Sequence, residues 1–578
     1  MFDLLIKNGN ILDGTGRPPY KSDVAIKNGR IVQIGQFGFF GDDIPMIDAT
    51  DKYVSPGFID THSHADAAAF LYPGCDSYLR QGITTFIGGQ CGDCSAPINK
   101  FWHRKFWEYD LWNDIDPFIF YPKTVQPADK VIDVIYKKTG YKVSWGSFTQ
   151  YVQAVEKAGL GCNMIYLAGH SQLRADVTGA DGDRRLSATE LNKIKDNIIE
   201  AFSAGAWGFS TGLDYPPSAY ADIQEITELT RFVKDLGGVY STHWKRTGLR
   251  VGTPQKPDKL RGIQDALDIA LDVGIKTEIA HLTTGFDVYP QNSQMDIYSA
   301  LVTLEMIDSY ISKGADVAFD VIPGTSGGIC TVPHLASLFM PWVKQSGGLD
   351  GLVRNLHAAD YRSSLIEYLC AGRWFNLNPV ADPAWDKKIL ITRSDNEYYT
   401  GKTIRQISEE EGKGSLELTL IMLRDDPRIM IETVHKSHEE IRTLLKHPRA
   451  SVCTDTFAFD LVGSYGVDSE FPELLPHPHT YCAFPKYILS YGMDKLEDTI
   501  QKITGGPATF FDIKGRGMIQ EGFYADLVIF DLNKLKTNES FIEPRVYPEG
   551  IDYVIVNGKI AVDSGELTGE KAGQILKR

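Results

Sequence analysis

The chain has 578 residues, of which 43% are hydrophobic and 23% are charged. This is the composition of an ordinary globular protein, so extensive disorder is excluded and the chain can form several domains or one large barrel. Lys and Arg total 59 against 75 Asp and Glu, which gives a net charge of −16. A chain this acidic is not expected to bind nucleic acid through the phosphate backbone.

The sequence predicts a cytoplasmic protein without a membrane partner. No stretch of about 18 apolar residues is present to span a bilayer, and the segment MFDLLIKNGN lacks the basic and apolar regions of a signal peptide. Eight cysteines are too few for a disulfide scaffold in a chain of this length, so we expect reduced thiols. The sequence does not indicate an oligomeric state.

Short β-strands are expected at both ends of the chain. Residues 1–56 contain FDLLIKNG and GRIVQIG, with the turn signals Asn8-Gly9 and Asn28-Gly29, and residues 505–578 contain YADLVIFD and DYVIVNGKIAVDSGEL. Strands from one terminus can cover a sheet edge left by the other. We therefore predict one small β-sandwich domain formed from both termini, with two unrelated β-extensions as the alternative.

Residues 57–504 alternate apolar, strand-like runs with amphipathic helices. Eight runs qualify as strands, namely FIDTHSH, ITTFIGGQC, CNMIYLAGH, WGFSTG, GVYSTHW, KTEIAHL, DVAFDVIP and ASVCTDT. A helix such as SATELNKIKDNIIEAFSAG begins at the capping-box pair Ser187 and Glu190 and ends at glycine. Alternating strands and helices favour a parallel sheet, and eight units favour a closed (β/α)8 TIM barrel, so the predicted fold class is α/β.

Two segments interrupt this alternation. Residues 323–447 are too long for a barrel loop, so we predict an insertion in the barrel domain and a candidate lid at the barrel mouth. Residues 101–127 form a smaller, aromatic-rich insertion, for which surface packing is at least as good an interpretation as substrate contact.

Potential metal ligands stand at the ends of five predicted strands. His62 and His64 end FIDTHSH, so their side chains share one face of a strand, at the barrel end where active sites lie. Two imidazoles suit zinc or a similar divalent ion. The other four strand ends carry Cys91, His243, His281 and Asp455. Agreement among five strand ends favours one metal site over isolated structural residues.

Two further segments carry weaker signals. His170 and Arg174 lie in GHSQLRADVTG at a strand end, where lining the pocket and structural hydrogen bonding are equally good interpretations. Cys94 follows Cys91 by three residues, but no second CxxC motif accompanies the pair, so a zinc ribbon is not expected.

The order of these motifs resembles the amidohydrolase superfamily and, within it, the D-aminoacylase (N-acyl-D-amino-acid deacylase) group. The resemblance is carried by VSPGFIDTHSHAD, GITTFIGGQCGDCSAP, GAWGFSTGLDYPPSAYA, HPHTYCAFPKYI, GGPATFFDIKGRGMIQEGFYADLVIFD and YVIVNGKIAVDSGELTG. It covers most of the chain apart from the two insertions. It implies a zinc-dependent hydrolase that cleaves the C–N amide bond of an N-acyl-D-amino acid or a related small N-acyl compound.

The resemblance also implies a role for each candidate ligand. Cys91, His243 and His281 would hold one tightly bound zinc ion. His62 and His64 would belong to a neighbouring, weaker metal position. Metal coordination lowers the pKa of water from about 15.7 toward about 7. Asp455 would accept the proton of this water, return it to the leaving nitrogen and contact the second metal.

Three positions that contact the substrate carboxylate in this group differ here. Thr283 stands where a lysine is typical, His479 stands where an arginine is typical, and Ile322 replaces a tyrosine. The candidate substrate-binding residues are therefore Lys245, Arg246, His479 and Arg174. Without a cation for the carboxylate, a cyclic amide, lactam or imide hydrolase is the alternative. A non-catalytic barrel that serves as a binding module is a further alternative, but the candidate ligand set is complete.

Overall fold

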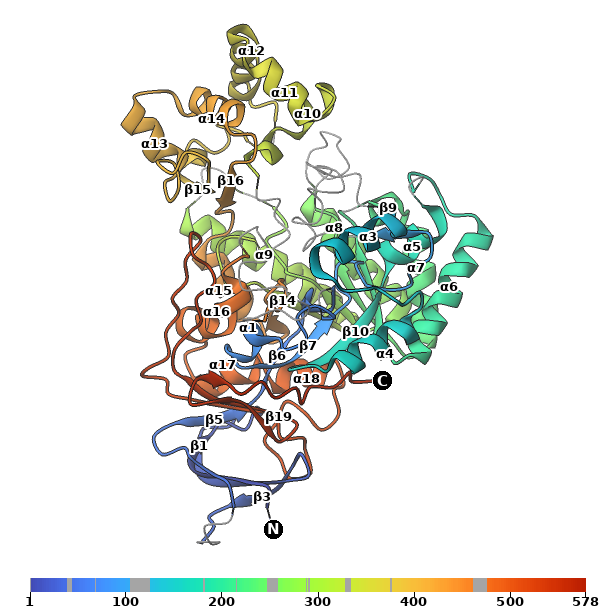
Figure 1. Ribbon diagram of the computed structural model, residues 1–578, viewed down its shortest axis with the longest axis vertical. Helices are drawn as coiled ribbons and strands as arrows, with labels where there is room; N and C mark the ends of the chain where they lie inside the picture. The colour runs from blue at the N-terminus through green and yellow to red at the C-terminus, as the bar shows by residue number, and fades with distance from the viewer. Residues whose placement is uncertain are drawn as a thin grey trace.

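The protein is described by a computed structural model that places a barrel between a β-sheet domain and a helical insertion (Figure 1). The structure describes all residues except 1, 39–43, 68, 104–124, 180–181, 215, 247–257, 287, 289–291, 328–333, 375–376 and 461–475. Most of the aromatic-rich insertion predicted at 101–127 therefore lies outside the described residues.

Eight parallel strands form the central barrel, and each pairs with the next in the order β6, β7, β10, β11, β12, β13, β14 and β17. Their bounds are β6 (Phe58–Asp60), β7 (Ile83–Gly88), β10 (Asn163–Gly169), β11 (Gly208–Gly212), β12 (Val239–His243), β13 (Thr277–Ile279), β14 (Val317–Val321) and β17 (Ala450–Val452). Each strand lies within one of the predicted runs, so the predicted α/β barrel is confirmed.

The barrel closes where the chain beyond β6 meets the chain beyond β17. The backbone N–H of Asp455 donates to the carbonyl oxygen of His62 at 3.0 Å, and that of His64 donates to Thr456 at 2.8 Å. The closing contact therefore fixes the backbone of three candidate site residues.

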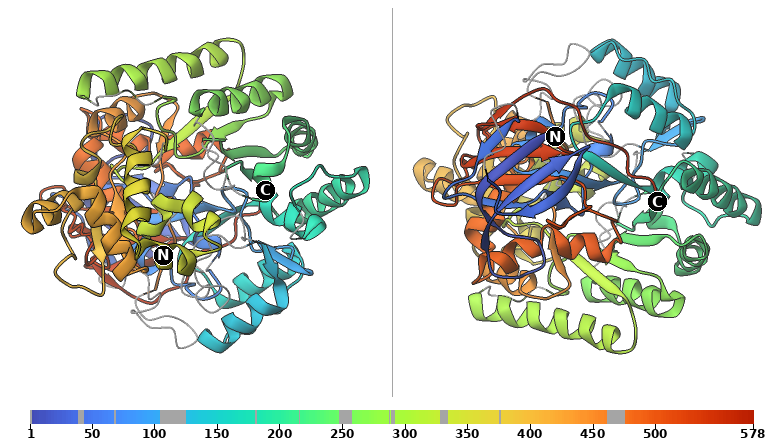
Figure 2. Two further views of the ribbon diagram at one scale, coloured as in Figure 1. Left: turned by 90° about the horizontal axis from the view of Figure 1, so that it is seen from above. Right: turned by 90° about the horizontal axis from the view of Figure 1, so that it is seen from below.

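Helices cover the outside of the barrel (Figure 2). They include α4 (Phe148–Ala158), α6 (Ala188–Ser203), α7 (Ile223–Asp235), α8 (Lys259–Ile269), α9 (Ser293–Ser312) and α15 (His438–Leu445). The predicted capping box is present at α6, where the side chains of Ser187 and Glu190 each accept a bond from the other's backbone N–H. The buried faces of these helices share one large apolar core with the strands.

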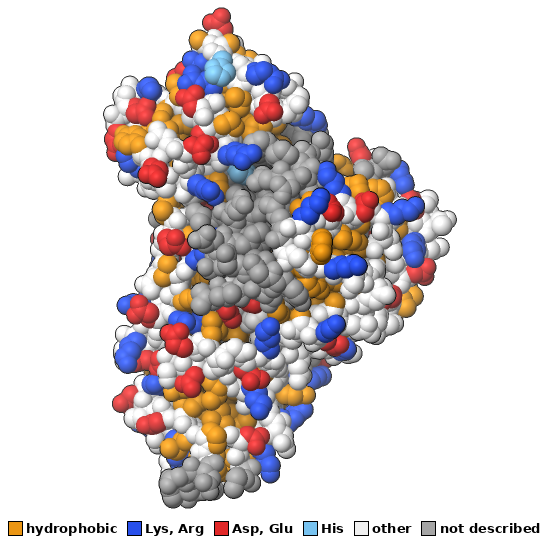
Figure 3. All heavy atoms as spheres, in the orientation of Figure 1, with side chains coloured by type: hydrophobic (Ala, Val, Ile, Leu, Met, Phe, Trp, Pro, Cys, Tyr) orange, Lys and Arg blue, Asp and Glu red, His pale blue; other side chains and the backbone are white. Residues whose placement is uncertain are grey.

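Two expectations of the sequence concern the described part of the chain, namely the absence of a membrane-spanning helix and the absence of a basic surface. None of its helices is both long enough and apolar enough to cross a bilayer. On the face shown in Figure 3, acidic and basic side chains are interspersed over the described surface.

Strands from both termini form one nine-stranded sheet, in which β5 pairs antiparallel with β18. Its strands are β1 (Leu4–Ile11), β2 (Tyr20–Lys27), β3 (Arg30–Gly35), β4 (Met46–Asp48), β5 (Tyr53–Pro56), β18 (Leu527–Phe530), β19 (Ile551–Val556), β20 (Lys559–Asp563) and β21 (Glu566–Leu567). Alternate side chains such as Ile6, Val24 and Leu527 fill a core of its own. Both termini thus build one β domain, as predicted.

Some C-terminal residues pack on the barrel rather than in this sheet. Helix α18 (Gly505–Phe510) and the following Phe511 and Ile513 share an apolar cluster with Ile59 and Ile87 of the barrel strands. The indole N–H of Trp207 donates to the carbonyl oxygen of Leu576 at 2.7 Å. The exact boundaries of the β domain stay a prediction.

The long predicted insertion forms a separate body between β14 and β17. It contains α10 (Met340–Gln345), α11 (Leu349–Leu356), α12 (Ala359–Cys370), β15 (Ile389–Arg393), α13 (Ile404–Glu411), α14 (Ser415–Asp425) and β16 (Met430–Thr433). These elements surround their own core, which includes Leu352, Trp374 and Leu418. In contrast, α15 packs in the barrel core, although it falls within the predicted range 323–447. The role of the insertion as a lid stays a prediction.

Candidate active site

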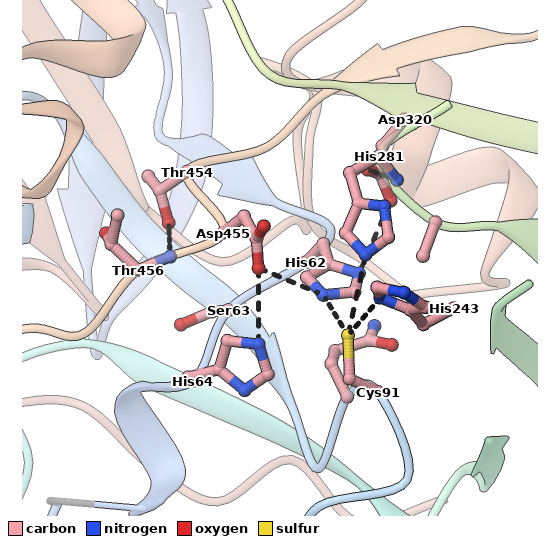
Figure 4. Close-up of polar contacts among 12 residues, drawn as sticks. His62, Ser63, His64, Cys91, His243, His281, Asp320, Thr454, Asp455 and Thr456 are labelled. Carbon is pink, nitrogen blue, oxygen red and sulfur yellow. Dashed lines mark hydrogen bonds and ion pairs between the residues drawn. The ribbon is translucent and has the colours of Figure 1, made fainter. Parts of the chain in front are cut away.

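Side chains from the ends of β6, β7, β12, β13 and β17 meet around the thiol of Cys91 (Figure 4). The Sγ atom lies 3.5 Å from His243 Nδ1, 3.5 Å from His281 Nε2 and 3.3 Å from His62 Nε2. All four side chains are buried. A thiolate and imidazole nitrogens gathered in a buried cluster are the ligand set that zinc favours in proteins.

A second group of potential ligands adjoins the first. The Oδ1 atom of Asp455 lies 3.2 Å from His64 Nε2 and 3.5 Å from His62 Nε2. In the first group, the donor atoms of Cys91, His243 and His281 lie within 4.8 Å of one another. The second group consists of His62, His64, Cys91 and Asp455, and its donor atoms also lie within 4.8 Å of one another. Because Cys91 belongs to both groups, the geometry accommodates two adjacent metal positions.

Three of these residues adopt the left-handed backbone conformation. The φ angle is 54° at Cys91, 35° at His281 and 51° at Asp455. A non-glycine residue held in this region costs about 1–3 kcal/mol, and such strain is concentrated at functional sites. Each of these three positions comes shortly after a barrel strand ends, so strained backbone holds three of the candidate site residues at the barrel mouth.

Burial and neighbouring charges set the protonation states of the site. The pKa of His281 lies well below its usual value, because burial disfavours the imidazolium form and Arg246 adds positive charge nearby. Burial alone would raise the pKa of Asp455, but the neighbouring imidazoles, first that of His281, hold it below its usual range. At neutral pH the histidine is therefore neutral, as a metal ligand must be, and the aspartate is ionised.

Two buried aspartates next to the candidate ligands belong to the site and were not among the predicted site residues. The Oδ1 atom of Asp320 accepts a bond from the backbone N–H of His281 at 2.6 Å, and its Oδ2 lies 3.8 Å from His62 Nδ1. Asp60 accepts bonds from the backbone N–H and hydroxyl of Thr454 at 3.0 and 2.6 Å. Burial raises the pKa of Asp320 to about 6 and that of Asp60 to about 7. In the sequence, both residues can be recognised as an aspartate within an otherwise apolar strand.

Of the two cations that follow β12, Arg246 lies in the site. Its Nη2 atom is 3.2 Å from both ring nitrogens of His243 and 3.1 Å from His281 Nδ1. Lys245 is exposed. Its positive charge has an electrostatic effect on Asp265, which lies on α8 on the outside of the barrel. The structure therefore places one of these two predicted substrate-binding residues against the ligands and the other away from them.

Arg174 belongs to a buried ion-pair network with His170. Its Nε atom lies 3.0 Å from Glu225 Oε1, and His170 Nε2 lies 2.9 Å from the same oxygen. The other guanidinium nitrogens donate to the carbonyl oxygens of Gly182 and Arg184. The guanidinium group of Arg174 is therefore bonded to other protein groups, and these contacts favour structural hydrogen bonding over the predicted substrate contact.

Arg174→Met is expected to lower the free energy of unfolding by about 3–5 kcal/mol, because it leaves the Glu225 carboxylate buried without its cation. Urea denaturation measures this loss. The matched control is Arg184→Met, which removes a partly exposed ion pair with Glu190 and should cost less than about 1 kcal/mol. Unchanged stability combined with a loss of substrate affinity would contradict the structural role.

Known proteins share the sequence pattern of this chain. The model of the amidohydrolase family matches residues 46–294 and 476–562, more than half of the chain. The chain belongs to the amidohydrolase family. It is therefore an amidohydrolase, an enzyme that acts on carbon–nitrogen bonds other than peptide bonds, and the predicted family is confirmed. The unmatched residues 295–475 include the helical insertion.

Similarity to individual proteins extends over the whole amidohydrolase chain. D-aminoacylase of Alcaligenes xylosoxydans xylosoxydans is 24% identical over 589 aligned residues, which cover 100% of this chain and 98% of the relative. A crystal structure of D-aminoacylase has a TM-score of 0.70 at 24% identity, with complete coverage of both chains. The zinc and phosphonate complex of N-acyl-D-glutamate deacylase from Bordetella bronchiseptica has a TM-score of 0.68 at 24% identity, again with complete coverage. These two structures support the fold.

Proposed function

We propose that this amidohydrolase is a zinc-dependent hydrolase of N-acyl-D-amino acids or related N-acyl compounds. The observation that carries the proposal is the buried cluster of Cys91, His243 and His281, whose donor atoms lie within 4.8 Å of one another. The similarity to D-aminoacylase along the full chain supports the substrate class. The similar N-acyl-D-glutamate deacylase binds zinc together with a phosphonate that mimics the tetrahedral intermediate.

The donor chemistry of the site fits zinc. Cys91, His243 and His281 would hold the tightly bound ion, and His62 and His64 would hold a second, weaker one together with Asp455. When bound, zinc lowers the pKa of a coordinated water toward about 7 and polarises the scissile carbonyl group.

The surroundings of Asp455 support a role in moving the protons of the reaction. Its carboxylate is buried and ionised, and it lies 3.2 Å from His64, which orients it. It can accept the proton of the attacking water and return it to the leaving nitrogen. An amide nitrogen leaves poorly until it is protonated, so one carboxylate that performs both transfers is sufficient. Arg246, which lies against the ligand histidines, is a candidate contact for the substrate carbonyl group.

Hydrolysis of a substrate panel by the zinc-loaded enzyme tests the proposed function. The panel contains N-acyl-D-amino acids, their L-enantiomers and cyclic amides, and release of the free amino acid is measured. We expect turnover of at least one N-acyl-D-amino acid and little turnover of the cyclic amides. Turnover of cyclic amides alone would favour the cyclic amide, lactam or imide hydrolase. Tight zinc binding without any turnover would favour a binding module.

A further inference from the structure

The insertion returns to the barrel with a buried lysine. Lys436 lies between β16 and α15, and only 5% of its surface is exposed. Its backbone N–H donates to the carbonyl oxygen of Thr325 at 3.0 Å, beside the loop that follows β14. Within the described ranges, the ammonium group of Lys436 makes no hydrogen bond or ion pair.

The charge of this lysine persists despite burial. Burial lowers the pKa of Lys436 to about 8, while the carboxylates of Glu440 and Asp455 act in the opposite direction. The ammonium form therefore predominates at pH 7, and it lies within electrostatic range of the proposed proton carrier. Glu432 on β16 does not neutralise it, because burial raises the pKa of Glu432 to about 8 and keeps that carboxyl protonated.

His479 lies on the other side of the same loop, at the start of α16 (His479–Lys486). Its side chain is fully buried, and neither ring nitrogen has a hydrogen-bond partner among the residues that the structure describes. A Cβ atom built on Gly324 would lie 2.2 Å from its Nε2, so the ring lies directly against the loop. The neighbouring His477 bonds Ser326 of this loop through Nε2 at 2.8 Å. Loop residues 324–326 thus contact both the lysine segment and the histidine segment.

We propose that Lys436 and His479 form the anion-binding part of the substrate pocket and hold the carboxylate of an N-acyl amino acid. This inference rests on the proposed function and names the groups that would select its substrate. A buried ammonium group without a contacting counter-ion is costly, and a substrate carboxylate would supply both a contacting negative charge and hydrogen-bond acceptors. Thr283 and Ile322 stand at positions that contact the substrate carboxylate in the similar group, and neither side chain carries a charge. Lys486 and Lys436 are the two lysines that act on His479 electrostatically. The ammonium group of Lys486 is paired with Glu539 at 2.6 Å, so Lys436 is the lysine left to bind a substrate anion beside His479.

Lys436→Met tests this assignment by removing the charge while it keeps an unbranched side chain of similar length. We would compare kcat/KM for an N-acyl-D-amino acid with kcat/KM for its neutral carboxamide. A charge-assisted hydrogen bond corresponds to about a 10- to 100-fold change. The acid should therefore lose about 10- to 100-fold, whereas the carboxamide should change less than about 3-fold. Lys436→Arg should recover part of the preference for the acid.

The matched control is Lys388→Met, which removes the same charge elsewhere in the insertion. The ammonium group of Lys388 is paired with Asp382 at 2.6 Å, so its loss should not alter the preference between acid and carboxamide. Thermal unfolding without substrate adds an independent readout. Lys436→Met should unfold at the same temperature as the unmodified enzyme or higher, because it removes an unpaired buried charge.

The outcomes separate this inference from the proposed function. Equal losses on acid and carboxamide, or a lower unfolding temperature without discrimination between them, would assign Lys436 a structural role and overturn the inference. Turnover of N-acyl amino acids that Lys436→Met leaves unaffected would refute the inference alone. If the unmodified enzyme hydrolyses no N-acyl amino acid, the proposed function and the inference both fail.

Discussion

Asp455→Asn is expected to lower kcat by about 10²- to 10⁴-fold while the tightly bound zinc is retained. The amide has the shape of the carboxylate but cannot accept the proton of water. The proposed tight position is formed by Cys91, His243 and His281, and none of these is changed. Single-turnover kinetics of the zinc-loaded variant, together with metal content by mass spectrometry, measure the two effects separately.

Asp460→Asn is the matched control for this prediction. Asp460 is a neighbouring, largely shielded aspartate whose Oδ2 accepts a bond from the backbone N–H of Gly74 at 3.0 Å, and it belongs to neither ligand group. Its variant should keep kcat close to that of the unmodified enzyme. Full activity of Asp455→Asn would refute its role in proton transfer. Loss of zinc in Asp455→Asn would show instead that Asp455 is a ligand of the tightly bound ion.

Cys91→Ala should release most of the bound zinc, with an affinity loss of at least about 100-fold. The thiolate is the one side chain common to both ligand groups, and alanine offers no donor atom in its place. Changes in residues that only support ligands already cost about 10- to 100-fold in metal affinity, so loss of a ligand should cost more. Competition with a chromogenic chelator measures the affinity without reference to turnover.

Cys94→Ala provides the comparison within the same loop. Cys94 is also buried, but its Sγ accepts a bond from the backbone N–H of Gly169 at 3.2 Å, and it belongs to neither ligand group. Burial holds the pKa of this thiol above its usual value, which disfavours the thiolate needed by a metal. Zinc affinity should therefore be unchanged. Equal zinc loss in both variants would point to damage of the loop rather than loss of a ligand.

The barrel and its ring of candidate ligands could be predicted because both depend on local sequence. A parallel strand that is buried on both faces appears in the sequence as a short apolar run. A polar side chain at the carboxyl end of such a strand lies at the barrel mouth, where active sites are found. His243 and His281 illustrate this, since each follows such a run and the structure brings them to the same thiol. Barrel closure then determined the placement of Asp455, although it lies nearly 400 positions after His62.

The partners of individual cations could not be predicted, because they come from distant segments. Arg174 follows a barrel strand in the sequence, as a pocket residue would. Its ion-pair partner Glu225 lies on α7, which belongs to a later strand–helix unit of the barrel. Lys245 and Arg246 are adjacent in sequence and still face different surroundings. Lys436 lies in no recognisable sequence motif. It became a candidate substrate contact only because the structure buries it beside the loop after β14.

The insertion leaves and rejoins the barrel at neighbouring points of the backbone. The N–H groups of His435 and Lys436 both donate to the carbonyl oxygen of Thr325, and Ser326 pairs with Val434. Residues 327–433 lie between these junction contacts, and their ends meet at one place beside the barrel. The junction is therefore separate from the strand pairing of β14 with β17. Under the proposed function, a change in the insertion that carries Lys436 would alter substrate preference and leave the candidate metal ligands on the barrel in place.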